Sequence, residues 1–392
     1  MDRRRVVAFI PARGGSKGIS HKNVAVVGGR PLIAWSLRAA LQSEEVDEVV
    51  VSTDSTVIAA VAEAFGDGVT VYRRDASTAT DTASTESAML EWAATADCDA
   101  VVLLQATSPL MTGADIDRCV RALDGADSAL TVVRTYDFLW STAASGNGAP
   151  VNYDPRNRPR RQDWSGNLVE SGAAYATRRT ALLATGCRVS GEIALVETPR
   201  EAGMEVDTSS DLLVADALLR AHTTRPDVAR SPIRLVLTDV DGVLTDNGLF
   251  YGEAGAEGKV FSARDGKGFQ LLREAGVAAG IITSESGPSL TERAAKLRLD
   301  EVCLASSDKL SDVVEIADRR GLSLREVAYI GDDVHDVQLL SAVGWSACPA
   351  DALPQVREVV SFVTAARGGD GAFREAADRL LRGMVARAPL GR

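Results

Sequence analysis

The segment RVVAFIPARGGSKGISHKN (5–23) joins an apolar run to a glycine-rich turn that carries several cations. A short apolar run rich in Val and Ile is typical of a buried strand in a parallel sheet. A glycine-rich turn at the carboxyl end of such a strand lets backbone N–H groups approach phosphate oxygens closely. The turn lacks the pattern GxxxxGK followed by Ser or Thr, so a P-loop nucleotide site is excluded. The segment predicts an α/β fold with a phosphate site; the alternative is a plain strand-to-helix turn with surface cations.

The rest of the first half repeats apolar runs and amphipathic helical patterns. Further buried strands are predicted at 48–53, 100–105 and 128–133, and helices at 31–42, 56–65 and 115–125. This alternation predicts a parallel sheet covered by helices. The segment 141–167 is polar and rich in Arg and Pro, so we expect a loop or lid there.

A second α/β pattern follows TTRPDVARSP (223–232), a segment without apolar periodicity that we interpret as a linker. Strands are predicted at 234–242, 278–284, 301–305, 327–333 and 344–350, with helical stretches between them. Alternation of this kind again indicates a sheet covered by helices. We therefore expect two α/β domains, at 1–222 and 233–392.

Composition narrows the class of protein. At 392 residues the chain is well above the usual length of one domain, so two domains are the default expectation. It has 43 Lys and Arg against 54 Asp and Glu, a net charge of −11, which disfavours nucleic acid or an anionic membrane as a partner. No apolar run is long enough to span a membrane, and the five cysteines are scattered. We expect a cytoplasmic enzyme that acts on small molecules.

Polar motifs lie at the ends of the predicted strands in the first half, where open α/β sheets bind ligands. These motifs are VSTD (51–54) and LLQATSPL (103–110). In EVDTSSDL (205–212), Glu205 and Asp207 lie on one face of an extended segment. Two carboxylates so placed suit Mg²⁺. A solvated strand edge is the alternative for this pair.

Eight segments of the first half, in this order and spacing, resemble the CMP-sialic acid synthetases (acylneuraminate cytidylyltransferases). They are IPARGGSK, HKN, STD, DTAST, LLQATSP, RRQDW, ESGAAY and EVDT, and the resemblance covers about residues 5–220. It implies a Rossmann-like nucleotidyltransferase sheet with a small dimerisation element. It also implies transfer of CMP from CTP to a 2-keto sugar acid, with release of pyrophosphate.

The resemblance also implies roles for particular residues. The triphosphate would be bound by Arg13, Gly14, Gly15, Lys17, Lys22 and Asn23, with Arg13 and Lys22 as catalytic cations. Arg74 and Ser84 would lie near the cytidine, and Gln105, Arg161, Gln162 and Tyr175 would line the sugar-acid pocket. Asp207 would bind Mg²⁺ together with Glu205, which stands where many relatives carry Asp.

The second half carries TDVDGVLTD (238–246) directly after an apolar run. Asp239 and Asp241 are two positions apart on an extended segment, so their side chains point the same way. With IITSES (281–286), SSDKLSD (306–312) and VAYIGDDVHD (327–336), this motif resembles the haloacid dehalogenase-like phosphatases.

That resemblance implies an aspartyl-phosphate mechanism. Asp239 would be the nucleophile, and Asp241 the general acid and base. Thr283 and Lys309 would hold the phosphoryl oxygens. Mg²⁺ would be bound by Asp239, Asp332 and the Asp241 carbonyl, with Asp333 and Asp336 as supporting residues.

Two further segments narrow the resemblance. The segment 247–272 predicts a hairpin, then RDGKG and a helix, and GGDGAFRE lies at 368–375. This arrangement is similar to the small cap-less phosphatases of Kdo 8-phosphate and related 2-keto sugar acids. It implies that Arg264, Lys267 and Arg374 lie near the substrate. It also implies a homotetramer in which hairpins help to close neighbouring sites.

Together the two halves predict a bifunctional enzyme with Mg²⁺ in both sites. It would activate a sialic-type acid with CTP and dephosphorylate the corresponding 9-phosphate. One alternative is cytidylyl transfer to another acid, such as Kdo or a phosphonate. The other is a second domain that serves only as a tetramerisation module, as in vertebrate synthetases whose catalytic set is degraded.

Overall fold

The structure is a computed structural model, and it describes residues 4–15, 18–75, 77–80, 82–142, 144–220, 231–251 and 257–385. Lys17 and most of the predicted linker lie outside the described residues. Close packing groups the chain into two compact units, one formed by Met1–Pro11, Trp35–Ser52 and Arg74–Asp207, the other by Ala12–Ala34, Thr53–Arg73 and Thr208–Arg392. Among the described residues, no helix combines the length and apolarity needed to cross a membrane.

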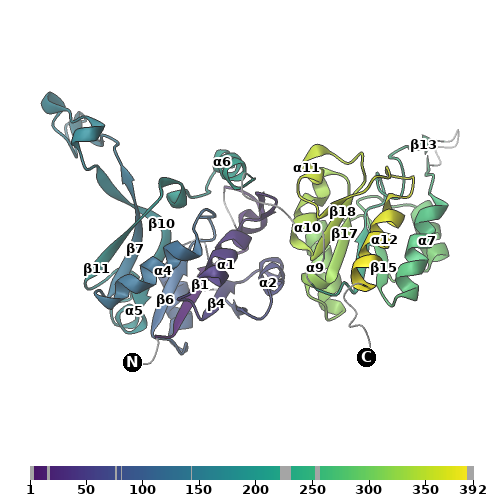
Figure 1. Cartoon of the computed structure of the whole chain (residues 1–392), viewed down its shortest axis with the longest axis horizontal. Helices are drawn as coiled ribbons and strands as arrows, with labels where there is room; N and C mark the ends of the chain where they lie inside the picture. The colour runs from purple at the N-terminus through teal and green to yellow at the C-terminus, as the bar shows by residue number, and fades with distance from the viewer. Residues whose placement is uncertain are drawn as a thin grey trace. The chain divides into compact units, whose positions relative to one another are not determined.

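The first large sheet has seven strands in the order β11-β7-β10-β6-β1-β4-β5 (Figure 1). Its strands are β1 (Val6–Pro11), β4 (Glu48–Thr53), β5 (Val69–Arg73), β6 (Ala100–Leu104), β7 (Ser128–Thr135), β10 (Asn167–Arg178) and β11 (Ile193–Thr198). β1 pairs in parallel with both β4 and β6, so the carboxyl ends of these three strands lie at one edge. The four predicted strands are therefore present.

The expected parallel pairing holds for β1, β4 and β6, but the sheet is mixed, because β10 runs antiparallel to both β6 and β7. Its sequence, NLVESGAAYATR, is rich in small and polar residues and has no long apolar run. Its register also shifts between Glu170 and Tyr175. Without a continuous apolar signal, β10 could not be recognised as a central strand from sequence alone.

The helices in this part of the chain are the three predicted ones and three others. They are α1 (Ile33–Gln42), α2 (Thr56–Glu63), α3 (Thr85–Ala93), α4 (Gly113–Arg121), α5 (Arg179–Thr185) and α6 (Ser209–Arg220). Short elements complete this part: η1 (Lys22–Val24), β2 (Val26–Val27), β3 (Arg30–Pro31), η2 (Ala122–Asp124) and η5 (Arg200–Gly203). At the start of α4, Thr112 and Asp115 form a capping box that fixes where the helix begins.

An arm extends from the ends of β7 and β10 (Figure 1). It contains a hairpin of β8 (Trp140–Thr142) and β9 (Gly148–Pro150), followed by η3 (Pro155–Asn157) and η4 (Arg161–Asp163). Phe138 stacks on Trp164 with ring centres 5.3 Å apart, and the Arg158 guanidinium lies 4.2 Å from the Phe138 ring centre. The predicted loop is thus held together by aromatic and cation–π contacts rather than by a core.

The second large sheet has six strands in the order β16-β15-β12-β17-β18-β19, and all its pairs are parallel. The strands are β12 (Leu235–Thr238), β15 (Ala278–Ile282), β16 (Glu301–Cys303), β17 (Val327–Ile330), β18 (Trp345–Cys348) and β19 (Phe362–Val363). The five predicted strands are all present. β19 was not predicted, since two residues are too short to give a periodic signal.

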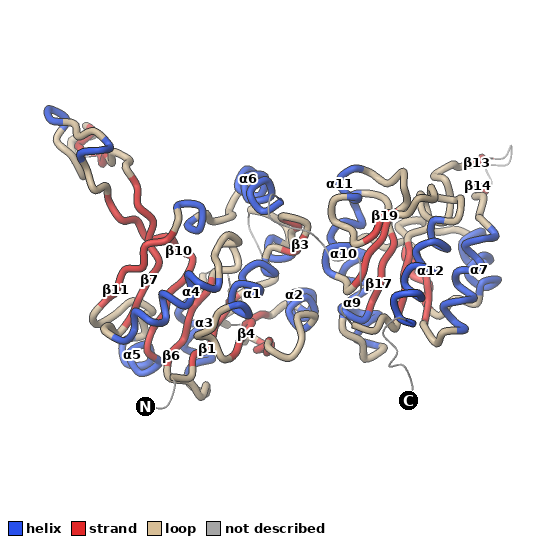
Figure 2. The backbone as a smooth tube through the Cα atoms, in the orientation of Figure 1, coloured by secondary structure: helices blue, strands red, loops and turns tan. Residues whose placement is uncertain are grey.

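Helices lie on either side of this sheet (Figure 2). They are α7 (Ala263–Glu274), α8 (Pro288–Leu297), α9 (Lys309–Arg319), α10 (Val337–Ala342), α11 (Pro354–Arg357) and α12 (Ala372–Val385), with η6 (Leu324–Glu326) and η7 (Val334–Asp336). Phe269 of α7 and Phe373 of α12 stack with ring centres 4.0 Å apart in the core. The predicted hairpin is formed by β13 (Phe250–Tyr251) and β14 (Glu257–Gly258).

Candidate active sites

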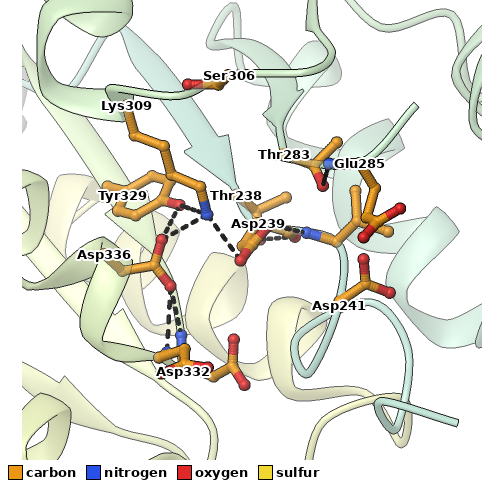
Figure 3. A network of polar contacts seen from close by, with 12 residues as sticks. Thr238, Asp239, Asp241, Thr283, Glu285, Ser306, Lys309, Tyr329, Asp332 and Asp336 are labelled. Atoms are coloured by element: carbon orange, nitrogen blue, oxygen red, sulfur yellow. Dashed lines mark hydrogen bonds and ion pairs between the residues drawn. The ribbon is translucent and has the colours of Figure 1, made fainter.

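Three neighbouring strands of the six-stranded sheet carry polar residues at their carboxyl ends. Asp239 follows β12, which pairs in parallel with β15 on one side and β17 on the other. Thr283 follows β15, and Asp332 lies two residues beyond β17. The three residues are buried, with exposed fractions of 8%, 1% and 8%. Because parallel strands end at the same sheet edge, their side chains gather in one place, as Figure 3 shows.

Lys309, the first residue of α9, is the buried cation of this cluster. Its Nζ atom lies 2.8 Å from Oδ2 of Asp239 and 2.7 Å from Oδ1 of Asp336. The same atom lies 3.3 Å from the hydroxyl of Tyr329 (Figure 3). One ammonium group therefore joins the end of β12 to the loop after β17.

Asp336 is more central than its predicted supporting role suggested. Its side chain is fully buried and accepts hydrogen bonds from the Tyr329 hydroxyl at 2.6 Å and the Asp332 backbone N–H at 2.9 Å. It also accepts a bond from the Asp333 backbone N–H at 3.2 Å. Asp333 itself caps η7. Asp336 thus fixes the backbone that carries Asp332.

The carboxylates of this cluster are poorly solvated. Burial, reinforced by the charge of Asp336, raises the pKa of Asp239 to about 7. Burial and the charge of Asp239 raise the pKa of Asp332 to about 7. For Lys309, burial alone would lower the pKa, but the charges of Asp336 and Asp239 outweigh it and raise the pKa. The cluster therefore has more negative charge than its lysine balances.

The residues present fit a divalent cation. Oxygen atoms of Asp239, Asp332 and Asp336 lie within 4.8 Å of one another, and Oδ1 of Asp332 is buried without a hydrogen-bond partner. Carboxylate oxygens are the ligands that Mg²⁺ prefers. Asp336 already accepts four hydrogen bonds, so Asp239 and Asp332 are the better placed ligands. The Gly242 backbone packs closely against the Asp332 carboxylate. Gly242 has φ +75°, and a Cβ there would lie 1.8 Å from Oδ2 of Asp332.

The Asp241 carboxylate forms an ion pair that the sequence did not predict. Lys259 places its Nζ atom 2.7 Å from each carboxylate oxygen of Asp241, and the lysine side chain is only 3% exposed. The Thr245 hydroxyl lies 3.4 Å from Oδ1 of Asp241. Asn247, also missed, donates to Oδ2 of Asp332 at 3.2 Å. Both residues lie in the predicted hairpin segment 247–272, but their partners could not be predicted because only folding brings the hairpin flanks to the strand ends.

Three basic residues expected near the phosphatase substrate lie away from the buried cluster. Arg264 is exposed and lies 3.5 Å from Asp370, and Lys267 is exposed on α7. The Arg374 guanidinium pairs with Asp378 of its own helix at 2.9 Å. The structure does not bring these three side chains into the buried cluster.

In the seven-stranded sheet, the glycine-rich turn is tied to its surroundings by two hydrogen bonds. The Gly14 N–H donates to Oδ1 of Asp54, after β4, at 2.8 Å. The Asn23 side-chain amide, which is buried, donates to the Arg13 carbonyl at 3.0 Å. Gly15 follows in the turn, and Lys22 begins η1. These two hydrogen bonds hold the backbone of Arg13 and Gly14 at the end of β1.

The residues expected near the cytidine and the sugar lie at several strand and helix ends. Arg74 follows β5 and donates to the carbonyl of Ser52, in β4, at 3.0 Å. The Ser84 hydroxyl caps α3. Gln105 follows β6, and its backbone N–H donates to the Ala173 carbonyl at 3.1 Å.

The predicted carboxylate pair lies beside the end of β6. The Val206 N–H donates to the Thr107 carbonyl at 2.8 Å, and Val206 is buried while Glu205 and Asp207 are exposed. Gly172, with φ +75°, faces the Glu205 carboxylate so closely that a Cβ there would lie 2.5 Å from Oε1. Glu205 and Asp207 therefore share one side of the chain, as expected from the alternation.

The predicted sugar-acid residues Tyr175, Arg161 and Gln162 lie in different parts of the fold, Tyr175 in β10 and the other two on the arm. Tyr175 is 2% exposed, and its hydroxyl donates to Glu170. The Arg188 guanidinium, which also pairs with Glu86, lies 4.4 Å from the Tyr175 ring centre. Arg161 and Gln162 belong to η4 on the arm, where the Arg161 guanidinium lies 4.7 Å from the Tyr136 ring centre. Within this chain, Arg161 is held by the arm and not by the sheet edge.

Comparison with known proteins matches two different families to the two halves of the chain. Residues 7–201 match the Cytidylyltransferase family, and residues 294–374 match the haloacid dehalogenase-like hydrolases. The N-acylneuraminate cytidylyltransferase of Oncorhynchus mykiss is 34% identical over 393 residues, covering 97% of this chain and 89% of that protein. N-acylneuraminate cytidylyltransferase A of Danio rerio is 34% identical, covering 96% and 89%.

The second half has relatives of its own. The 3-deoxy-D-manno-octulosonate 8-phosphate phosphatase KdsC of Haemophilus influenzae is 37% identical over 150 residues, covering 38% of this chain and 83% of that protein. A solved structure of that phosphatase from Moraxella catarrhalis, in complex with magnesium ion, phosphate ion and KDO, is 34% identical. It covers 38% of this chain and 87% of that chain, with a TM-score of 0.38.

The fold and these matches define a cytidylyltransferase joined to a haloacid dehalogenase-like domain. The chain belongs to the N-acylneuraminate cytidylyltransferase family over nearly its full length. Its C-terminal part is homologous to the KdsC phosphatases.

Proposed function

We propose that the chain carries out two consecutive reactions on a sialic-type sugar acid. Residues 1–222 would transfer CMP from CTP to the acid, and residues 233–392, after the linker 223–232, would remove phosphate from the acid 9-phosphate. The observation that carries the phosphatase half is the buried cluster of Asp239, Lys309, Asp332 and Asp336. A domain kept only for assembly would have no need to bury these charged groups, because their desolvation is costly.

In the first reaction, the anomeric hydroxyl of the acid would attack the α-phosphorus of CTP. The bond to the oxygen that bridges the α- and β-phosphates would break, pyrophosphate would leave with the electron pair, and the hydroxyl proton would be released. The fixed turn at Gly14 and Gly15 supports binding of the triphosphate by backbone N–H groups. Arg13, Lys17 and Lys22 would offset its charge, with Lys22 and Arg13 acting as the charge increases at the reacting phosphate.

The remaining binding roles extend this proposal. Asn23, Arg74 and Ser84 would complete the CTP site, and Gln105, Arg161, Gln162 and Tyr175 would bind the sugar acid. The planar guanidinium of Arg161 suits the acid's carboxylate. Glu205 and Asp207, whose shared orientation favours a common ligand, would hold Mg²⁺.

In the second reaction, Asp239 would attack the phosphorus of the 9-phosphate. The bond from phosphorus to the sugar oxygen would break, and that oxygen would take a proton from Asp241. Water would then attack the aspartyl-phosphate, Asp241 would accept the water proton, and orthophosphate would leave with Asp239 restored. Thr283 and Lys309 would hold the phosphoryl oxygens, because both lie beside Asp239 (Figure 3).

Asp239, Asp332 and the Asp241 carbonyl would hold Mg²⁺, with Asp333 and Asp336 in support. When bound, the ion would neutralise carboxylates that otherwise repel a phosphate dianion. Arg264, Lys267 and Arg374 would reach the substrate only after leaving their present positions. Exposed apolar residues of the hairpin region favour a homotetramer: Phe250 is 71% exposed and Val260 is 78% exposed.

The proposal is tested by phosphorus NMR of the protein with CTP, Mg²⁺ and the 9-phosphate of a sialic-type acid. We expect orthophosphate, pyrophosphate and a CMP-sugar to appear together. The variant Asp239→Asn should release no orthophosphate yet still form CMP-sugar from the free acid. CMP-sugar from free acid alone, with the 9-phosphate intact, would leave the second domain as an assembly module.

Kdo and its 8-phosphate are the comparison substrates, because the second half is homologous to a Kdo 8-phosphate phosphatase. Pyrophosphate release with Kdo or a phosphonate, and none with a sialic-type acid, would replace the proposed substrate.

A further inference from the structure

Lys259 lies directly after strand β14 and reaches the phosphatase cluster from the hairpin side. Its side chain is 3% exposed, and its Nζ atom lies 2.7 Å from both carboxylate oxygens of Asp241. The lysine is therefore shielded from water, unlike the cation of a surface ion pair, whereas the Asp241 side chain is 26% exposed. The hairpin delivers a buried cation to a single carboxylate.

This pair constrains where the Asp241 carboxylate lies. A buried ammonium group needs a charged partner, since removal from water is otherwise costly. Among the described residues, the Thr245 hydroxyl also lies 3.4 Å from the Asp241 carboxylate, which is long for a hydrogen bond. Lys259 is therefore the stronger restraint on the orientation of this carboxylate.

The pair also matters for the charge of the cluster. Asp239, Asp241, Asp332 and Asp336 are four carboxylates, and Lys259 and Lys309 are the ammonium groups that contact them. Without Lys259, Lys309 would be the one ammonium group among the described residues that contacts these carboxylates. A phosphate dianion would then meet stronger repulsion, because the low local dielectric increases charge–charge energies.

We propose that Lys259 is a positioning residue for phosphatase catalysis, which holds the Asp241 carboxylate in place and offsets its charge. This role rests on the phosphatase function proposed above. Asp241 would give a proton to the leaving sugar oxygen in the first step and take one from water in the second. Both steps need its carboxylate at hydrogen-bond distance from the reacting oxygen. Because β14 leads straight into Lys259, the placement of the hairpin determines this geometry.

The test compares Lys259→Met with wild-type protein on two phosphate esters in the presence of Mg²⁺. A sugar-acid 9-phosphate has an alkoxide leaving group that needs a proton, whereas p-nitrophenyl phosphate has a leaving group that does not. We expect the variant to lose about 100-fold in kcat on the sugar phosphate. On p-nitrophenyl phosphate it should release a rapid burst of about one p-nitrophenolate per site, followed by slow turnover, because hydrolysis of the aspartyl-phosphate still needs Asp241.

Two further variants complete the design. Lys259→Arg should restore part of the sugar-phosphate kcat, since a guanidinium can also hold a carboxylate through two parallel bonds. Lys296→Met removes an exposed lysine of α8 and should leave all rates unchanged. Circular dichroism should match that of the wild type in every variant.

Equal losses on both esters without a burst would overturn the role, because they would indicate damage to Asp239 or to the fold. Unchanged rates in Lys259→Met would overturn it as well, while leaving the phosphatase function intact. Wild-type protein that releases phosphate from neither ester would instead refute the phosphatase function itself, together with this role.

Discussion

The Nζ atom of Lys309 lies 2.7 Å from Oδ1 of the fully buried Asp336. The same carboxylate accepts bonds from two backbone N–H groups, those of Asp332 and Asp333. Asp336 is therefore the structural link between the cation beside Asp239 and the loop that carries Asp332. A group with four donors around it is satisfied only as a carboxylate, because an amide would turn two of its own N–H donors toward them.

The first prediction follows from that arrangement. Asp336→Asn should lower the free energy of unfolding by about 3 kcal/mol, because it leaves Lys309 with one carboxylate partner and sets donor against donor. Phosphate release should fall at least about 10-fold as the Asp332 loop shifts, while cytidylyl transfer is unaffected. Urea unfolding and both activity assays measure these effects. Asp318→Asn, an exposed position on α9, is the control, and full phosphatase activity in Asp336→Asn would contradict the prediction.

The second prediction concerns pH and Mg²⁺. The pKa values of Asp239 and Asp332 are raised to about 7 in the folded state, above the value of about 4 that an unfolded chain has. The metal-free folded protein therefore binds more protons than the unfolded chain between about pH 4 and pH 7. Proton binding by Asp239 and Asp332 stabilises the fold fully below about pH 4, and this stabilisation is lost as the pH rises toward 7. Mg²⁺ binds the ionised carboxylates and should restore stability mainly at the higher pH.

Thermal unfolding at pH 5 and pH 8, each with Mg²⁺ or with EDTA, measures this effect. The rise in Tm caused by Mg²⁺ should be larger at pH 8, by a few degrees. In Asp332→Asn the difference between the two pH values should shrink. An equal rise at both pH values in the wild type would argue against an ion held by these carboxylates.

The third prediction concerns Gly172. A Cβ at this position would lie 2.5 Å from Oε1 of Glu205, so Gly172→Ala should displace that carboxylate. If Glu205 helps to hold Mg²⁺, more Mg²⁺ will be needed for half-maximal pyrophosphate release. Gly186→Ala is a matched control, since its φ of +69° carries the same backbone strain but the nearest atom to a Cβ is 3.9 Å away. An identical Mg²⁺ requirement in both variants would separate Glu205 from the metal site.

The fourth prediction concerns the turn after β1. Asn23→Ala removes the amide that donates to the Arg13 carbonyl at 3.0 Å. The turn should lose its fixed conformation, and kcat/KM for CTP should fall about 10-fold, which is the cost of one charge-assisted or buried hydrogen bond. The KM for the sugar acid should change little. Steady-state kinetics with each substrate varied in turn measure this, and Asn147→Ala on the exposed arm is the control. If Asn23→Ala changed the KM for the sugar acid more than the kcat/KM for CTP, Asn23 would not belong to the CTP site.

Much of the fold could be predicted because its signal is local. Nine apolar runs became nine strands, and most of these strands are buried, although β16 is short and its Val302 is 45% exposed. β10 was missed because its burial depends on neighbours on both sides and not on its own apolar content. β19 is too short to carry any periodicity.

Prediction of the site had a similar limit. Asp239, Lys309 and Asp332 belong to motifs at strand or helix ends, and topology brings such ends together. Lys259 and Asn247 lie in the predicted hairpin segment but were given no role there, so their contacts could be found only in the folded chain. The structural role of Asp336 could not be predicted from the sequence either. That role depends on how many hydrogen-bond donors surround its carboxylate in the folded protein.

The sequence by itself determined the two α/β sheets, the order of the strand-end motifs and the resemblance to a synthetase joined to a phosphatase. These are properties of short segments, in which apolar period and turn chemistry act over a few residues. The tertiary structure decided which carboxylates share a cation, that Asp241 faces Lys259, and that Tyr175 turns its hydroxyl to Glu170. Those choices depend on burial and on distances between residues far apart in the chain, and charge interactions become strong and selective only where water is excluded.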